Sequence, residues 1–138
     1  MKHIIEIENW TPHTLNKLMG CHYRQAARYK ASDTQVIGVY AKKTNTPKAQ
    51  GKRHMTLEVV KAGAGRLADP DAYFKSVLDA LVRIGLLRDD SSHWVEWSQP
   101  IIRRGKETKT IITLEDIAIH PAHVHHTPRR TAKPMAKS

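Results

Sequence analysis

The segment from Pro70 to Gly85 constrains the fold more than any other part of the sequence. Its apolar residues recur at the three- and four-residue spacing that places them on one face of an α-helix. These residues are Phe74, Val77, Leu78 and Leu81. Proline is favoured at the first position of a helix, and glycine commonly ends one. The segment therefore predicts a helix from Pro70 to about Ile84.

Four segments with alternating or β-prone residues predict strands. Isoleucines alternate with glutamates over residues 3–8, which indicates a short edge strand. The same alternation over 55–59 predicts a second strand, and two tryptophans with a valine favour a third near 93–102. The run Arg103-Arg104-Gly105-Lys106 then predicts a turn, with residues 108–115 as the hairpin partner of the third strand.

A long helix is expected between the first two strands. Thr11 followed by Pro12 is typical of a helix start, with the threonine as N-cap and the proline at the first helical position. Apolar residues keep a helical period from there to about residue 42. We expect one helix over 12–42, broken near Ser32-Asp33.

These segments predict one α+β (mixed α/β) domain over residues 1–118, with a small mixed sheet packed against two main helices. At 138 residues the chain has room for a single core. Residues 120–138 contain four histidines, three prolines, four lysines or arginines and no acid. This composition predicts a disordered basic tail over 119–138. For its spaced histidines, His120, His123, His125 and His126, adventitious metal affinity is favoured over a functional zinc site.

The sequence is typical of a soluble cytoplasmic protein. Cys21 is the one cysteine, so no intramolecular disulfide can form, which suits a reducing compartment. Glu6 and Glu8 interrupt any apolar run near the start, so no signal peptide is expected there. No segment approaches the ~20 apolar residues of a membrane span.

The net charge of the chain indicates which class of partner it binds. The formal net charge is +10, and strongly basic proteins bind polyanions, most often nucleic acid. Yet five of the thirteen carboxylates lie between residues 69 and 90, at Asp69, Asp71, Asp79, Asp89 and Asp90. A cluster of carboxylates in a nucleic-acid-binding protein is a candidate site for a divalent cation that acts on a phosphodiester.

Two interpretations of this acidic segment are open. In the structural one, Asp69 caps the helix, and Asp71, Lys75 and Asp79 form surface ion pairs of small value with Arg83. In the catalytic one, Pro70 holds Asp69 in an extended conformation, so that the carboxylates of Asp69 and Asp71 converge at the helix entrance. Lys75 lies one turn further on the same face, where it can meet a phosphate oxygen.

A longer pattern around these residues resembles the signature of the RusA-type Holliday-junction resolvases. The pattern is Leu67-Ala-Asp-Pro-Asp-Ala-Tyr-Phe-Lys-Ser-Val-Leu-Asp-Ala-Leu81, followed by Gly85-Leu-Leu-Arg-Asp-Asp90. The segment Thr11-Pro-His-Thr-Leu-Asn16 also resembles the Pro-Ser-Asn-type opening segment of that family. The resemblance covers roughly residues 4–116. These are small dimeric, magnesium-dependent endonucleases of bacteria and prophages. In one departure, the family pattern has asparagine after the second aspartate, where this chain has Ala72.

The resemblance implies a function and a set of site residues. The activity is symmetric cleavage of four-way DNA junctions in recombination and repair. Asp69, Asp71 and Asp90 are implied as ligands of magnesium, with manganese as the alternative, and Lys75 as the catalytic lysine. The resemblance leaves the role of Asp89 open, and we assign Asp79 to structure.

The spacing of the three aspartates favours a site shared between two subunits. A helix of about fourteen residues is roughly 20 Å long, and it separates Asp71 from Asp90. Residues 85–90 would need almost their full reach to run back along it. In a two-fold dimer with antiparallel helices, each helix start meets the partner's helix end. We therefore expect a homodimer in which Asp69, Asp71 and Lys75 of one chain meet Asp90 of the other.

Basic residues outside the acidic segment are the expected DNA contacts. They lie in the loop near residues 43–53 and in the turn at 103–106: Lys42, Lys43, Lys48, Lys52, Arg53, Arg103 and Arg104. The alternative function is a non-catalytic DNA-binding protein of the same fold, in which the carboxylates serve only as caps and surface ion pairs. Ala72 in place of asparagine keeps this alternative open.

Overall fold

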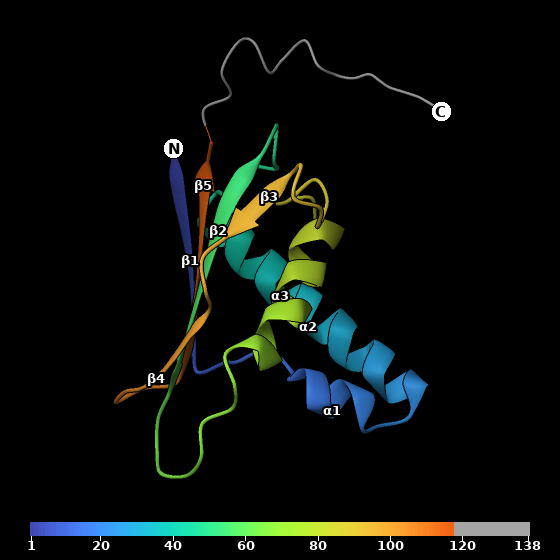
Figure 1. The fold of residues 1–138 in the computed structure, drawn as a ribbon, viewed down its shortest axis with the longest axis vertical. Coiled ribbons are helices and arrows are strands. Elements are labelled where there is room, and N and C mark those ends of the chain that lie inside the picture. Colours follow the sequence, from blue (N-terminus) through green and yellow to red (C-terminus); the bar gives the residue numbers. More distant parts are fainter. Residues whose placement is uncertain (118–138) are drawn as a thin grey trace.

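The computed structural model of the protein describes residues 1–117, so the predicted tail over 119–138 lies outside the described residues. The chain forms a mixed sheet with helices on one side of it (Figure 1). The elements in chain order are β1 (Lys2–Glu8), α1 (Leu15–Met19), α2 (Tyr23–Lys43), β2 (Arg53–Lys61), α3 (Asp71–Arg83), β3 (Val95–Trp97), β4 (Ile101–Arg104) and β5 (Lys109–Asp116). The coarse α+β prediction is confirmed.

The sheet has the order β1-β5-β2-β3, and β4 pairs with the same central strand β2. β5 is antiparallel to both of its neighbours, β1 and β2, whereas β3 and β4 are parallel to β2. Parallel neighbours need a crossover connection, and α3 supplies it between β2 and β3. The prediction that β1 is an edge strand is confirmed.

The predicted hairpin between the strand near 93–102 and residues 108–115 is wrong. Pro100 lies between β3 and β4, and neither of them pairs with β5. β5 instead lies between β1 and β2, where Thr110, Ile112 and Leu114 are fully buried. A strand with that many buried residues needs a partner on each side, whereas β4 has no buried residue and lies at the edge.

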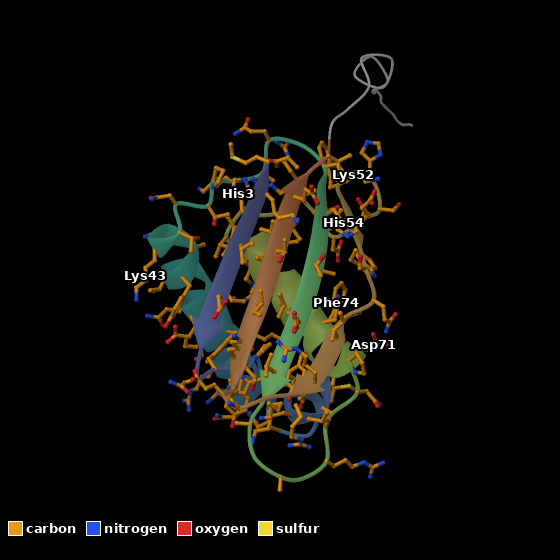
Figure 2. All side chains as sticks on the ribbon, turned by 90° about the vertical axis from the view of Figure 1, so that its left-hand side faces the viewer. His3, Lys43, Lys52, His54, Asp71 and Phe74 are labelled. Atoms are coloured by element: carbon orange, nitrogen blue, oxygen red, sulfur yellow. The ribbon has the colours of Figure 1, made fainter. Side chains whose placement is uncertain are left out.

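Successive side chains of each strand point alternately to the two faces of the sheet. Met55, Leu57 and Val59 of β2 point into the core, together with Ile5 of β1 and Ile112 of β5. α2 and α3 cover this face, and the figures show the strands on one side and the helices on the other (Figures 1 and 2). No helix of residues 1–117 covers the opposite face.

The prediction of one long helix over 12–42 is wrong about where the helix starts and where it is interrupted. Residues 11–14 are not helical, α1 begins at Leu15, and the interruption falls at residues 20–22 rather than near Ser32-Asp33. His22 caps α2 by accepting a hydrogen bond from the backbone N–H of Arg24. Asp33 lies inside α2 because its carboxylate has a tertiary partner, the segment at His13.

The helix predicted from Pro70 is confirmed as α3. Residue Gly85 follows it with φ +84°, a left-handed conformation that glycine adopts without strain. Six residues of the helix are buried: Tyr73, Ser76, Val77, Leu78, Ala80 and Leu81. None of the helices within residues 1–117 is long and apolar enough to cross a membrane.

Arg53 is a structural residue, which corrects its prediction as a DNA contact. Its side chain is only about 1% exposed. The guanidinium donates to the Asp116 carboxylate at 2.7 Å and to the carbonyl of Leu86 at 2.9 Å. A buried guanidinium needs such partners because desolvation is costly. Arg53 thus links the ends of two strands to the segment after α3.

This ion pair predicts a pH-dependent contribution to stability. Hydrogen bonding from Arg53 lowers the pKa of Asp116 below its ordinary value of 3.8. A carboxyl with a lowered pKa in the folded chain stabilises it above the unfolded pKa, and this contribution is lost as pH falls through the folded value. Asp116→Asn should therefore reduce the free energy of unfolding at about pH 7, and the deficit should shrink below pH 3.8.

Urea unfolding of both proteins across this pH range measures the deficit. Glu115→Gln is the matched control, because it removes an exposed neighbouring carboxylate that Arg53 does not contact. A deficit that stays constant from neutral to acidic pH would contradict the role assigned to the ion pair.

Candidate functional site

Asp69 and Asp71 lie at the entrance of α3, and both are exposed. The backbone carbonyl of Asp69 accepts the N–H of Ala72 at 2.9 Å, so the first turn is closed by backbone. Within residues 1–117 neither carboxylate accepts a hydrogen bond or forms an ion pair. A capping role for the Asp69 side chain is therefore wrong, and both carboxylates are free to bind a cation.

A pocket of about 310 Å³ opens beside these carboxylates. Its walls come from the loop before α3, the first turn of α3 and the segment before α1. The lining residues are Thr14, Arg66, Leu67, Ala68, Asp69 and Ala72. The pocket thus holds one carboxylate and one guanidinium, which suits a ligand that combines a cation with an anion.

Two sets of hydrogen bonds hold the pocket walls. The guanidinium of Arg104 donates to the backbone carbonyls of Gly63 and Gly65, in the loop that leads to Asp69. On the other side, the Ser76 hydroxyl of α3 donates to the carbonyl of His13 at 2.8 Å. Each wall is therefore tied to an element of the folded core.

His13 is itself fixed by the buried carboxylate of Asp33. The backbone N–H of His13 donates to one carboxylate oxygen at 3.0 Å, and its Nδ1 lies 2.8 Å from the other. The imidazole also stacks on Tyr29, with ring centroids 4.1 Å apart. Burial raises the pKa of Asp33, and the hydrogen bonds from His13 oppose that rise. This contact positions the segment that carries Thr14.

Lys75 follows Asp71 by one helical turn and is 54% exposed. Its ammonium lies 3.4 Å from the Asp79 carboxylate. Of the predicted surface ion pairs along the helix, this Lys75–Asp79 pair is the one that forms within residues 1–117. An exposed pair of this kind contributes little to stability. The lysine can therefore exchange Asp79 for a phosphate oxygen at small cost.

Asp90 lies at the opposite end of α3 from Asp71. The helix has thirteen residues, which is about 20 Å at ~1.5 Å per residue. Figure 1 shows α3 running from the loop before it to the segment that leads into β3. Within residues 1–117, no three His, Cys, Asp or Glu side chains come together as a metal-binding group. One chain therefore does not gather Asp69, Asp71 and Asp90.

The segment after α3 is held at its own end of the helix. The N–H groups of Leu86 and Leu87 both donate to the carbonyl of Leu81, and both leucine side chains are buried. Arg53 binds the Leu86 carbonyl as well. Only residues 88–90 could extend from this fixed point back along α3. Three extended residues span about 10 Å at most. Asp90 therefore cannot return to Asp71 of the same chain.

The predicted DNA contacts are spread over the surface. Figure 2 places Lys43 on the α2 side of the sheet and Lys52 near the β3 side. Lys42, Lys43 and Lys48 are exposed, and Lys52 lies 3.8 Å from Glu96. Lys48 packs against Gly85, so it lies at the same end of α3 as Asp90.

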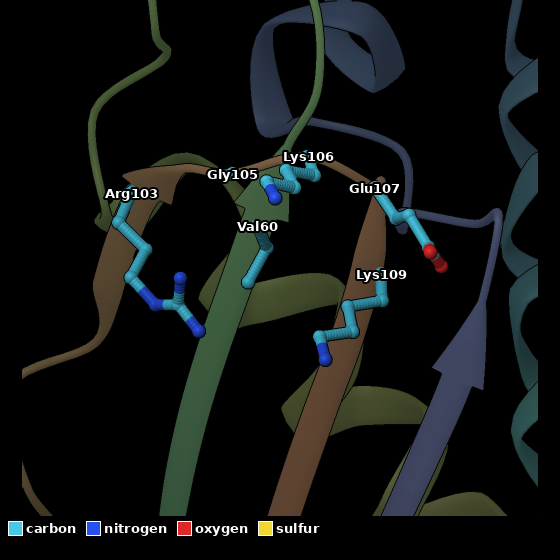
Figure 3. A pocket seen from close by; sticks show the side chains of 6 residues that line it. All are labelled: Val60, Arg103, Gly105, Lys106, Glu107 and Lys109. Atoms are coloured by element: carbon cyan, nitrogen blue, oxygen red, sulfur yellow. The ribbon is translucent and has the colours of Figure 1, made fainter.

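Arg103 and Arg104 lie at the end of β4, and both are engaged within the chain. Arg103 forms an ion pair with Glu58, and Arg104 binds the loop carbonyls described above. Beside them a pocket of about 210 Å³ lies over Val60, lined also by Arg103, Gly105, Lys106, Glu107 and Lys109 (Figure 3). A Cβ at Gly105 would clash with the side chain of Val60, so this turn requires glycine.

Sequence reasoning missed Arg66, Thr14 and the His13–Asp33 contact. The resemblance of residues 11–16 to the opening segment of the RusA-type resolvases was a signal for Thr14. Arg66 is one of many basic residues, and nothing local distinguishes it. The pairing of His13 with Asp33 joins residues twenty positions apart, which no local pattern indicates.

No protein-family model and no curated protein sequence matches the chain.

The dispersed basic residues lead to a prediction about DNA affinity. Lys48→Gln with Lys52→Gln should weaken binding to duplex DNA and make its salt dependence shallower, by up to about 0.9 in log–log slope for each lost phosphate contact. Fluorescence anisotropy over a range of salt concentrations measures the slope. Lys2→Gln is the control, an exposed lysine on β1 outside the predicted contacts. If Lys2→Gln changed the salt dependence of binding by the same amount per lost charge, net charge alone would determine the DNA affinity.

Proposed function

We propose that the chain is a magnesium-dependent endonuclease that cleaves four-way DNA junctions, as its resemblance to the RusA-type resolvases implies. The observation that carries the proposal is the pair of exposed carboxylates at the entrance of α3 that have no hydrogen-bond or ion-pair partner within residues 1–117. In a chain of net charge +10, such a pair has no evident structural purpose. The pocket beside it also supplies Arg66 for an anion.

The donor atoms of the site fit magnesium. Magnesium prefers oxygen ligands and is commonly held by one or two carboxylates together with substrate phosphates. Asp69 and Asp71 would supply these carboxylates, and manganese would accept the same set. When bound, the ion would supply activated water and charge neutralisation at the phosphodiester.

The remaining roles fall to the basic side chains near the entrance. Lys75 shares the helix face of Asp71, and it would stabilise the negative charge that develops on the phosphate during cleavage. Arg66 would orient a second phosphate oxygen from across the pocket. Both are exposed in the free protein, so DNA can reach them without a change of fold.

Completion of the site requires a second copy of the chain. Leu86 and Leu87 hold the start of the following segment at the far end of α3, which keeps Asp90 from Asp71 of its own chain. A two-fold dimer with antiparallel α3 helices brings the third carboxylate from the partner. Lys48 would come with it, because it packs against Gly85 at that end. Two such sites related by a two-fold axis suit the two symmetric cuts of a junction.

A non-catalytic DNA-binding protein is the second candidate. It is favoured by Ala72, which supplies no amide, and by the lack of any three-residue metal-binding group within residues 1–117 of one chain. A protein that only binds DNA would use the positive charge of the chain, and the carboxylates of Asp69 and Asp71 would have no role in its function. The two candidates differ in what Asp71 does.

The first test replaces Asp71. Asp71→Asn should abolish magnesium-dependent cleavage of a labelled four-way junction, and junction binding should persist or tighten because an anion near the phosphates is removed. Gel electrophoresis of cleavage products and anisotropy measure the two effects. Asp79→Asn is the matched control on the same helix, and it should still cut. Cleavage by Asp71→Asn at the original rate, or none by the natural chain with magnesium or manganese, would favour the non-catalytic candidate.

The shared site predicts complementation between two inactive proteins. Asp71→Asn and Asp90→Asn should each be inactive, and mixing them should restore nicking of one strand. The reason is that a mixed dimer carries one intact site and one doubly altered site. If both residues served the same chain's site, every site in the mixture would keep a lesion and no activity would return. A pull-down with two different tags must first show that the subunits exchange.

A further inference from the structure

Trp97 is an exposed aromatic residue on β3 that has no role in the proposed nuclease site. It is 45% exposed and ends β3, where it pairs in register with Met55 of β2. Because Met55 points into the core, Trp97 lies on the helix-covered face of the sheet, at its open edge. Its ring contacts Phe74 of α3, with centroids 5.0 Å apart and a tilt of 54°.

The indole is held firmly on its inner side. The backbone on both sides of it is fixed, because β3 pairs with β2 and the Ser98 N–H donates to the Met55 carbonyl at 3.2 Å. Phe74 is partly buried and packs against the core cluster, so it supports the ring from below. The outer part of the indole faces solvent and does not need to move to accept a ligand.

The position of this ring relates it to the proposed site. Phe74 follows Asp71 by three residues, and both therefore lie on neighbouring positions of one helix turn. Figure 2 shows Phe74 and Asp71 close together at the β3 side of the sheet, with His54 and Lys52 further along the same side. Lys75, next to Phe74 in the chain, supplies a positive charge at this edge.

The size of the exposed aromatic area indicates what can cover it. A tryptophan buries at most ~250 Å² of surface, so a ring that is 45% exposed offers about 100 Å². A stable protein interface needs ~800 Å² from each partner. Asp71 and Lys75, which flank Phe74 on α3, are exposed and charged, so the helix beside the ring offers charge rather than further apolar surface. The area matches one nucleobase, and the positive charge of the chain favours a nucleic acid as its source.

We propose that Trp97, supported by Phe74, stacks on an unpaired nucleobase of the bound DNA, beside the strand that enters the Asp69–Asp71 site. This binding role rests on the proposed function. It also accounts for structure selectivity, because bases at a branch point can unstack more easily than bases within a duplex. Every base has an aromatic face, so the contact would select DNA shape rather than sequence.

The experiment measures binding without cleavage. The full chain is titrated into a labelled four-way junction and into a linear duplex of the same sequence, in buffer with a chelator in place of magnesium. Trp97→Ala should weaken junction binding by roughly 5- to 100-fold, the range for loss of one base–aromatic stack, and change duplex binding by less than about twofold. Trp97→Phe should retain most of the junction affinity because it keeps an aromatic face.

Two further variants separate stacking from folding. Trp97→Leu keeps an apolar cover on Phe74 but has no aromatic face, so it should lose junction preference while its thermal unfolding stays close to that of the natural chain. Ile101→Ala is the matched surface control. Ile101 is 49% exposed, and its register with Glu58 places it on the opposite face of the sheet. It should bind both DNAs normally.

The outcomes distinguish this inference from the proposed nuclease activity. Wild-type affinity of Trp97→Leu for the junction, or equal losses for junction and duplex, would overturn the stacking role even if the natural chain cuts DNA. A change from dimer to monomer in Trp97→Leu would overturn it too, by showing that a second copy covers the ring. Selective loss of junction binding supports the stacking role, whether or not magnesium-dependent cleavage is observed.

Discussion

Burial of the apolar face of α3 is the interaction on which the rest of the structure depends. Val77 and Leu81 are completely buried between this helix and the sheet, and each such side chain contributes about 1.5–3 kcal/mol to stability. The burial fixes how the helix is rotated about its axis, because its apolar residues occupy only one face. The face with Asp71 and Lys75 is thereby turned outward, and Phe74, at the boundary between the faces, meets Trp97 at the edge of the sheet.

The two ends of α3 are held by different kinds of interaction, and this difference explains where binding residues can lie. The far end is held by buried leucines, Gly85 and the guanidinium of Arg53, so little of it can rearrange. The entrance is held mainly by polar contacts, namely the hydrogen bond of the buried Ser76 hydroxyl and those of the Arg104 guanidinium. Hydrogen bonds of this kind leave side chains and a pocket accessible, whereas close packing would fill it. A ligand site at the entrance is consistent with this arrangement.

The sequence predicted those parts of the fold that depend on local periodicity. α3, β1 and β2 follow from spacing within a few residues, because one face of each element is buried. The hairpin failed because a turn signal at Gly105 says nothing about which strand is the neighbour, and burial of β5 favoured a central position between β1 and β2. The predictions for Arg53 and Asp33 failed for the same reason. Each residue is charged and resembles a surface residue until its distant partner in the fold is known. The site formed by the entrance carboxylates stays a prediction. Their separation from Asp90 was expected from the length of the helix, and the contacts of Leu86 show how the far end is held.

The unpaired carboxylates also have an electrostatic consequence. Exposed ion pairs contribute about 0–1 kcal/mol, so leaving Asp69 and Asp71 without partners costs the fold almost nothing. Under the proposed function, the two charges would instead weaken DNA binding, because negative charges at the entrance repel phosphates within a Debye length of about 10 Å. A divalent cation cancels that charge and turns a repulsive spot into one that phosphate can approach. Under the proposed function, the surrounding lysines and arginines would attract DNA at longer range, and contact between DNA and the entrance would depend on a bound metal ion.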